Sequence, residues 1–320
     1  MGTVKEEVFM AGMRRKIALI GAGNIGGSLA LLASLKQLGD IVLFDVVDGL
    51  AAGKALDLSH AIPVFGVSVS ITGTTNYSDI QGADVCIITA GIARKPGMSR
   101  DDLLNTNAGI MKNVAAGIRE HAPEAFIIVV SNPLDAMVTL CQRETKRPTN
   151  MVVGMAGVLD SARYRAFLAS ELNISPASIN ALVLGGHGDD MVPIRSYTTV
   201  NGIPITQLVK ADRLDAIEKR VRGAGGEVVS LLKTGSAFCS PAAAAIEMAE
   251  SYLFDQKKVL PCAAYLNGEY GYQGLYIGVP VILGRGGVEK IIEIELTAQE
   301  RSALEVSANG VRELMKALPA

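Results

Sequence analysis

Three ionisable side chains lie in two short segments that suit acid–base chemistry on an anion. His187 sits in residues 185–189 (GGHGD), directly after an apolar stretch, and its small neighbours leave the imidazole accessible. Asp160 and Arg163, in residues 159–163 (LDSAR), are three apart and share one face of a helix. A carboxylate that binds a histidine fixes its tautomer and raises its pKa, while a guanidinium holds a carboxylate through two parallel hydrogen bonds. Taken singly, the two segments also fit a loop histidine without a role and a surface ion pair.

A polar segment with two further arginines follows one of the apolar stretches. Residues 92–100 carry Arg94 and Arg100 together with a proline and a glycine, and they come directly after the apolar residues 85–90. Loops at the carboxyl ends of strands in open parallel sheets are where ligands bind. We expect this loop to close over an anion, and the alternative is a solvated basic loop. The two remaining histidines, His60 and His121, are interpreted as structural or solvated.

The glycine-rich residues 21–26 (GAGNIG) match the pattern G-x-G-x-x-G. They follow a predicted strand at 16–20 and open a predicted helix at 26–37, and Asp45 lies nineteen residues after Gly26. In such a turn the first glycine permits the bend, the second lets the backbone approach a pyrophosphate, and the third lets the helix pack on the strand. Asp45 would accept hydrogen bonds from a ribose diol and repel a 2′-phosphate, which favours NAD over NADP. A glycine-rich turn without a ligand is the alternative.

The elements that must position these side chains alternate between short apolar runs and helical stretches. Strands are predicted at 16–20, 41–45, 67–72, 85–90 and 126–130, with helices at 26–37 and around 49–60. Strands that are apolar on both faces and separated by helices indicate a parallel sheet covered on both sides. The fold class is therefore α/β, with an N-terminal doubly wound Rossmann sheet.

The second half of the chain has a different pattern. A strand is predicted at 180–184, a mostly helical stretch at 205–253 that breaks near Gly235 and Pro241, and antiparallel strands at 276–283 and 291–295. A C-terminal amphipathic helix is predicted at 298–318, N-capped by Thr297. We expect an extension at residues 1–13, a nucleotide-binding Rossmann domain at 14–153 and an α+β substrate domain at 154–320.

Composition excludes several classes of protein. The 320 residues are 49% hydrophobic and 19% charged, with a formal net charge of −2 and no tryptophan, which argues against disorder and against a nucleic-acid partner. The longest apolar runs are far shorter than a membrane span, and residues 1–13 do not read as a signal peptide. The four cysteines form no C-x-x-C pair, so we expect neither a disulfide framework nor a zinc site, and we expect a cytoplasmic location.

Together these motifs resemble a known family over essentially the whole chain, from about residue 15 to 318. The chain is similar to the lactate/malate dehydrogenase superfamily, and within it to NAD-dependent malate dehydrogenases of the lactate-dehydrogenase-like type. The resemblance is carried by six segments: residues 21–26, 89–91 (TAG), 94–100, 131–135 (SNPLD), 159–163 and 186–189. It implies an oxidoreductase of the tricarboxylic acid cycle that moves a hydride between malate or oxaloacetate and NAD, without a metal, and it implies a homotetramer, with a dimer as the alternative.

The resemblance also implies a role for individual residues. His187 would be the general acid/base, and Asp160 would hold its protonated imidazole. The substrate-binding residues would be Arg94, Arg100, Asn132, Arg163 and Ser236. The cofactor-binding residues would be Gly21, Ala22, Gly23, Asn24, Ile25, Gly26, Asp45, Thr89, Ala90, Gly91, Asn107, Val130, Ser131 and Asn132.

Arg94 would decide the substrate, because malate enzymes of the family carry arginine where lactate enzymes typically carry glutamine or an altered loop. Oxaloacetate has a second carboxylate to pair with it and pyruvate has none. A lactate or broad 2-hydroxy-acid dehydrogenase is the first alternative. An NAD- and metal-dependent glycosidase is the second, although Ser131 stands where its cysteine ligand would be expected. A binding protein that senses NAD without turnover is the third.

Overall fold

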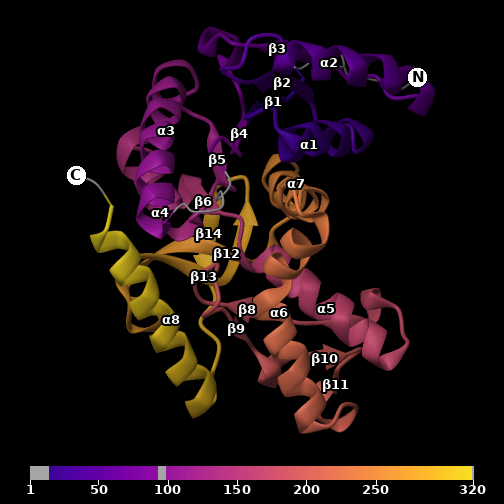
Figure 1. The fold of residues 1–320 in the computed structure, drawn as a ribbon, viewed down its shortest axis with the longest axis vertical. Helices are drawn as coiled ribbons and strands as arrows, with labels where there is room; N and C mark the ends of the chain where they lie inside the picture. The colour runs from indigo at the N-terminus through magenta and orange to yellow at the C-terminus, as the bar shows by residue number, and fades with distance from the viewer. Residues whose placement is uncertain (1–13, 93–98, 319–320) are drawn as a thin grey trace, which may run out of the picture.

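The computed structural model describes residues 14–92 and 99–318. A nine-stranded sheet runs through the molecule in the order β14-β13-β12-β6-β5-β4-β1-β2-β3 (Figure 1). Its six parallel strands have the Rossmann order, with β1 at the centre. These strands are β1 (Lys16–Ile20), β2 (Asp40–Phe44), β3 (Ile71–Thr74), β4 (Val85–Ile88), β5 (Phe126–Val129) and β6 (Val152–Gly154). The predicted α/β fold class is confirmed.

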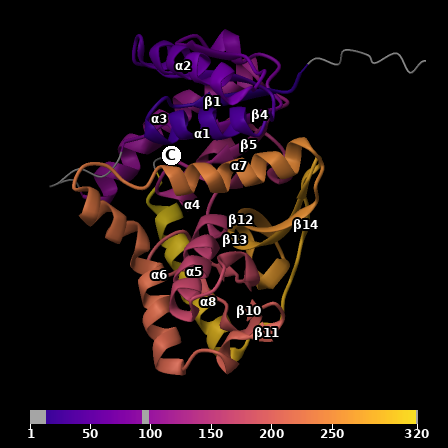
Figure 2. The same cartoon turned by 90° about the vertical axis from the view of Figure 1, so that its right-hand side faces the viewer.

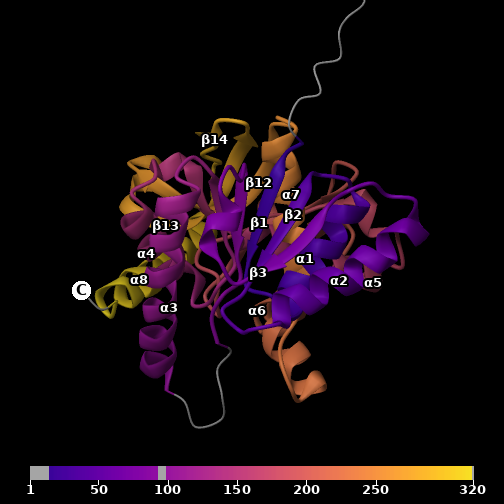
Figure 3. The same cartoon turned by 90° about the horizontal axis from the view of Figure 1, so that it is seen from above.

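Both faces of the parallel strands are buried, because successive side chains point to opposite sides. In β1, Ile17 and Leu19 pack with α1 (Asn24–Leu35) and α7 (Cys239–Leu253), whereas Ala18 and Ile20 pack toward α3 (Arg100–His121) and α4 (Leu134–Thr145). Figure 3 shows α3 and α4 on one side of the strands and α1 and α2 (Leu50–Ala61) on the other. Helix α7 comes from the second half of the chain. The second half therefore contributes to the layer that covers the parallel strands.

Three antiparallel strands from the second half extend the same sheet beyond β6. They are β12 (Lys258–Asn267), β13 (Gln273–Gly284) and β14 (Gly287–Ile291), and β12 pairs with β6 at Ala263 and Gly154. The predicted strand at 276–283 is confirmed within β13. Two expectations were wrong here: 291–295 is not a strand beyond its first residue, and β12 was not predicted at all.

The remaining elements form a layer at the end of the molecule opposite α2 (Figure 2). Helices α5 (Gly157–Leu172) and α6 (Ala211–Leu232) enclose an apolar cluster with two small sheets beside them. The small strands are β7 (Ile179–Asn180), β8 (Val183–Leu184), β9 (Val192–Pro193), β10 (Thr199–Val200) and β11 (Ile203–Pro204). The single strand predicted at 180–184 is wrong, because the chain leaves one sheet after Asn180 and pairs with another partner from Val183.

The helix ends follow local sequence signals. The break near Gly235 is confirmed, but Pro241 lies in the first turn of α7, where a missing N–H costs nothing. Helix α8 (Ala298–Lys316) begins with the expected cap: Thr297 and Glu300 satisfy each other's backbone N–H groups. Strand β3 begins four residues later than predicted. Within the described ranges, no helix is long and apolar enough to cross a membrane.

Candidate active site

The glycine turn between β1 and α1 leaves a surface free of side chains at one point and is tightly packed at two others. A Cβ on Gly26 would lie 1.9 Å from the carbonyl oxygen of Gly21. Gly21 has a φ of +111°, and a Cβ there would lie 2.6 Å from Thr89 Oγ1 and 2.9 Å from the backbone nitrogen of Ala90. A Cβ on Gly23 would meet nothing within 4 Å among the described residues. The first and third glycines are therefore required by packing, while the second faces open space at the N-terminus of α1. Turns of this kind bind a pyrophosphate in dinucleotide-binding folds.

Asp45 follows β2 and fixes this turn. Its Oδ2 accepts a hydrogen bond from the backbone N–H of Ala22 at 2.6 Å, and its Oδ1 accepts one from Val47 at 3.0 Å. Each carboxylate oxygen has a further lone pair, so the carboxylate can still accept from a ribose hydroxyl. Lys54, which was not predicted, donates from Nζ to the carbonyl oxygen of Gly23 at 2.7 Å. It brings a positive charge to the turn. The spacing of Lys54 in the sequence does not predict this contact, because 31 residues separate it from Gly23.

The carboxyl ends of β1, β4 and β5 are tied together by side chains of the predicted cofactor residues. The hydroxyl of Thr89 donates to the Gly21 carbonyl at 3.2 Å, and that of Ser131 donates to the Ala90 carbonyl at 2.6 Å. Asn107 in α3 donates to the Asn132 carbonyl at 2.7 Å.

Asn107 also exchanges two hydrogen bonds with the backbone of Ile92. Its side chain is therefore engaged with the main chain of both loops, and it holds the exits of β4 and β5 in place. Of the other predicted residues of this group, Asn24 and Ile25 begin α1, and Gly91 and Val130 lie just after β4 and β5.

Asp160 lies between the two other candidate catalytic groups. Its Oδ2 is 2.7 Å from His187 Nδ1, and its Oδ1 accepts from Arg163 Nη1 at 3.1 Å. Asp160 is 1% exposed, so the surface ion pair weighed as an alternative is excluded. The first two turns of α5 place Asp160 and Arg163 on one face, as predicted. With Nδ1 donating to Asp160, the Nε2 of His187 is left for another partner.

The loop that carries His187 is anchored to several different elements. Gly185 and Gly278 of β13 exchange two backbone hydrogen bonds of 2.9 Å, and the N–H of Gly186 donates to Ser307 Oγ of α8 at 2.8 Å. The backbone N–H of His187 donates to Asp135 Oδ2 of α4 at 3.0 Å. Together with Asp160 of α5, four elements fix this short segment, which holds the imidazole at one position.

The pKa of His187 is set by opposing effects. Burial alone lowers it, but the charge and the hydrogen bond of Asp160, joined by the charge of Asp135, raise it above its ordinary value, against a smaller lowering effect of Arg163. A histidine whose pKa is raised by a buried carboxylate is suited to give and to take a proton.

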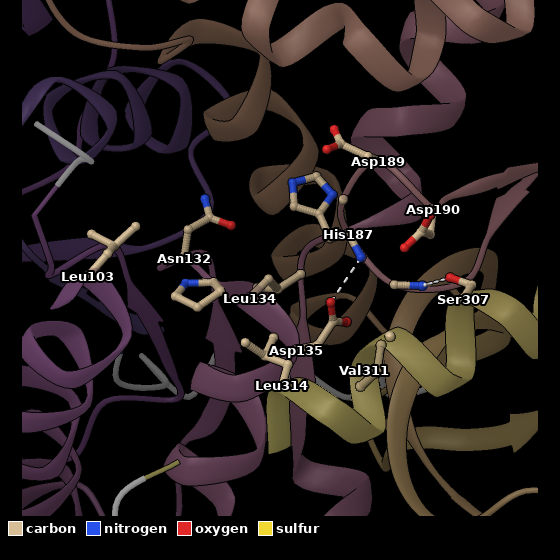
Figure 4. Close-up of a pocket in the computed structure, with 14 residues that line it drawn as sticks. Leu103, Asn132, Leu134, Asp135, His187, Asp189, Asp190, Ser307, Val311 and Leu314 are labelled. Atoms are coloured by element: carbon tan, nitrogen blue, oxygen red, sulfur yellow. Dashed lines mark hydrogen bonds between the residues drawn. The ribbon is translucent and has the colours of Figure 1, made fainter. Parts of the chain in front are cut away.

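A cavity of about 440 Å³ opens beside His187. Asn132 and His187 line it, and Val311 and Leu314 of α8 contribute an apolar wall (Figure 4). The full lining comprises Leu103, Asn132, Pro133, Leu134, Asp135, Gly186, His187, Gly188, Asp189, Asp190, Ser307, Gly310, Val311 and Leu314. Sequence reasoning missed the contribution of α8 and of Asp135, although Asp135 stands in the same short motif as Asn132.

Not every predicted substrate residue is brought to this cavity. Ser236 is exposed in the connection between α6 and α7 and does not line the cavity. Arg94 lies outside the described residues, and Arg100 is described only as the first residue of α3. Of the other histidines, His60 is exposed, and His121 lies 3.8 Å from Glu120.

Both halves of the chain match models of one protein family. Residues 15–154 match the family model described as the lactate/malate dehydrogenase NAD binding domain, and residues 157–318 match the lactate/malate dehydrogenase alpha/beta C-terminal domain. The chain is 58% identical over 313 residues to malate dehydrogenase 2 of Anaeromyxobacter dehalogenans, an alignment that covers 95% of this chain and 99% of that protein.

Solved structures of malate dehydrogenases and of lactate dehydrogenases are similar to this chain to nearly the same degree. A malate dehydrogenase of Cryptosporidium parvum matches with a TM-score of 0.94 and 44% identity, covering 96% of this chain and 99% of the other. A lactate dehydrogenase of the same organism, in complex with lactic acid and nicotinamide adenine dinucleotide, matches with a TM-score of 0.93 and 45% identity, covering 95% and 98%. By its sequence, its sheet order and the grouping of His187, Asp160 and Arg163, this chain belongs to the lactate/malate dehydrogenase family.

Proposed function

We propose that the protein is an NAD-dependent malate dehydrogenase, which interconverts malate and oxaloacetate. The observation that carries the proposal is Asp160, a buried carboxylate that binds both the imidazole of His187 and the guanidinium of Arg163. An acid–base group that lines a cavity and an anion-binding group are thereby held by one carboxylate. This combination suits a 2-oxo acid, which has a carbonyl to protonate and a carboxylate to hold.

His187 is assigned the role of general acid/base. The bond from Nδ1 to Asp160 fixes the tautomer, so Nε2 donates a proton to the carbonyl oxygen of oxaloacetate and removes it again from malate. Asp160 stabilises the imidazolium that is needed in the reduction direction. NAD, when bound at the glycine turn, supplies or accepts the hydride.

Arg163 is assigned to the carboxylate beside the reacting carbon, and Asn132 to both substrate and cofactor. Arg100, at the start of α3, would polarise the carbonyl and stabilise negative charge that develops on its oxygen. Ser236, which is exposed in the connection between α6 and α7, is assigned to a wall of the substrate pocket by the family resemblance alone. The glycine turn with Asp45, and the exits of β4 and β5, would hold NAD.

Arg94 is proposed to select the dicarboxylate. A guanidinium enclosed with oxaloacetate has a carboxylate partner, whereas with pyruvate it would be left unpaired at a cost on the order of 3–5 kcal/mol. Discrimination of about a hundredfold or more is then expected. The 58% identity to a protein named malate dehydrogenase supports this choice, whereas the solved structures include malate and lactate dehydrogenases alike.

We further propose a cofactor-binding domain at 14–153 and a substrate domain at 154–320, a division supported by the ranges of the two family models. A homotetramer, a cytoplasmic location and a place in the tricarboxylic acid cycle complete the proposal. The apolar composition and the free, mostly buried cysteines are compatible with the first two.

The substrate is tested by following NADH oxidation at 340 nm with oxaloacetate and with pyruvate. We expect a strong preference in kcat/KM for oxaloacetate, and we expect Arg94→Gln to reduce that preference by about a hundredfold. Lys95→Gln, in which the neighbouring cation is removed, is the matched control and should keep the preference. Comparable turnover of pyruvate by the unmodified protein would contradict the malate assignment while leaving the dehydrogenase chemistry in place.

A further inference from the structure

A second buried carboxylate contacts His187 from a different direction. Asp160 binds the imidazole ring. Asp135 accepts a hydrogen bond from the backbone N–H of the same residue at 3.0 Å (Figure 4). Asp135 lies in the first turn of α4, three residues after Asn132, and therefore belongs to the half of the chain that carries the glycine turn. His187 is thus held by one acid from each half of the molecule.

Asp135 is in an environment that is unfavourable for a charge. It is 5% exposed, and its Oδ1 has no hydrogen-bond partner among the described residues. Burial raises the pKa of Asp135 to about 6, although the backbone N–H and the charge of His187 oppose the rise. A neutral side chain of the same shape would avoid the cost of burying this charge. A costly buried acid at a cavity wall, next to an acid–base histidine, is typical of functional sites.

The surrounding loop is packed closely around this carboxylate. A Cβ on Gly186 would lie 3.2 Å from Asp135 Oδ2 and 2.8 Å from Val311 Cγ2, so a side chain at position 186 would push the loop away from α4 and α8. The hydrogen bond of 3.0 Å from His187 to Asp135 can form because Gly186 carries no side chain. Any displacement of the first turn of α4, which follows Asn132 directly, moves the backbone of His187 with it.

We propose that Asp135 is a positioning residue for the acid–base reaction, which fixes the backbone of His187 from the cofactor-binding half while Asp160 fixes its ring. The inference rests on the proposed function, since it assigns Asp135 a part in the proton transfer by His187. Asp135 does not contact the reacting atoms in this assignment. It acts through the position of the loop and through its negative charge.

The charged groups that face His187 determine what removal of this charge does. Helix α5 contributes Asp160 and Arg163, and the loop itself contributes Asp189 and Asp190 to the cavity wall. Helix α8 contributes only groups that do not titrate, namely Ser307, Gly310, Val311 and Leu314. Because the charge of Asp135 raises the pKa of His187, Asp135→Asn is expected to lower that pKa.

The first test uses the cofactor-free protein and does not depend on turnover. The chain has three histidines, so their imidazole nitrogens can be titrated individually by NMR in ¹⁵N-histidine-labelled protein, with His187→Gln to assign the signal. We expect Asp135→Asn to titrate His187 at a lower pH than the wild type. The control is Glu144→Gln, the same chemical change near the end of α4, which should leave the titration unchanged.

The second test separates positioning from folding. Asp135→Asn keeps an acceptor oxygen, so we expect kcat/KM for oxaloacetate at pH 8 to fall about three- to tenfold. Asp135→Ala removes the acceptor, and a loss on the order of 100-fold is expected. Removal of a buried charge should leave the melting temperature of Asp135→Asn at pH 8 equal to or above that of the wild type.

Two results would overturn the inference, and a third would contradict the proposed function alone. An unchanged His187 titration together with unchanged kinetics in Asp135→Asn would show that the contact has no effect. A lower melting temperature, or failure of both neutral variants to fold, would show a structural role instead. Lack of any oxaloacetate turnover by the wild type would contradict the proposed function, while the NMR titration would still decide whether Asp135 acts on His187.

Discussion

The glycine turn and the histidine loop present groups to a ligand by opposite means. The turn at residues 21–26 offers backbone and open space, and what matters there is the absence of a Cβ at Gly23 and Gly26. The loop at residues 185–189 offers one side chain, held by buried carboxylates from α4 and α5. The first region should therefore be sensitive to added volume. The second should be sensitive to charge even when shape is kept.

The largest effect is expected from removal of the acid–base group. His187→Gln keeps a polar side chain of similar size but cannot carry the proton near neutral pH. We expect kcat/KM for oxaloacetate to fall about 10³-fold or more. NADH binding, measured by its fluorescence, should stay close to that of the wild type because the glycine turn is untouched. Activity above a tenth of the wild-type value would rule out His187 as the acid–base group.

A pair of glycine substitutions tests the first region. Gly26→Ala places a methyl group 1.9 Å from a backbone oxygen, and such overpacking costs about 1–3 kcal/mol or more, so the melting temperature should fall by several degrees. Gly23→Ala meets no described atom within 4 Å and should leave the melting temperature nearly unchanged.

The same pair separates packing from cofactor binding. The methyl group of Gly23→Ala occupies the space proposed for the pyrophosphate, so NADH affinity should fall about tenfold, or roughly 1.4 kcal/mol. Titration of NADH fluorescence and thermal melts of both variants give the comparison. Equal effects of the two substitutions on stability and on affinity would contradict the distinction between the second and third glycines.

The same contrast explains how much the sequence could predict. The glycine turn is local: its strand, bend and helix are adjacent in the chain, and β1 and its parallel neighbours were located within a few residues. Asp160 and Arg163 were also found by spacing, since three residues along a helix define one face. These predictions needed no knowledge of distant contacts.

What was missed depends on residues far apart in the sequence. Asp135 and His187 are separated by 52 residues, and only the packing of α4 against the loop brings them together. The side of the cavity formed by α8 was missed for the same reason, because α8 reaches the cavity only through the tertiary packing. Strand β12 was overlooked although its pairing with β13 is extensive, and the break between Asn180 and Val183 depends on which strands pair with each side. No local pattern encodes such partners.

The proposed mechanism requires His187, held by the carboxylate of Asp160, to carry the proton in both directions of the reaction. The most direct measurement is the pH dependence of kcat/KM for oxaloacetate reduction and malate oxidation, in the wild type and in Asp160→Asn. Oxaloacetate reduction needs the protonated imidazole, and malate oxidation needs the neutral one. As the pH increases, kcat/KM for reduction should therefore fall and kcat/KM for oxidation should rise over the same pH interval.

In Asp160→Asn, burial that lowers the pKa of His187 is no longer offset by the charge of Asp160. Both curves should therefore move to lower pH, and kcat should fall on the order of 100-fold. Curves that do not move with the substitution, or that fail to share one interval in the wild type, would contradict the account.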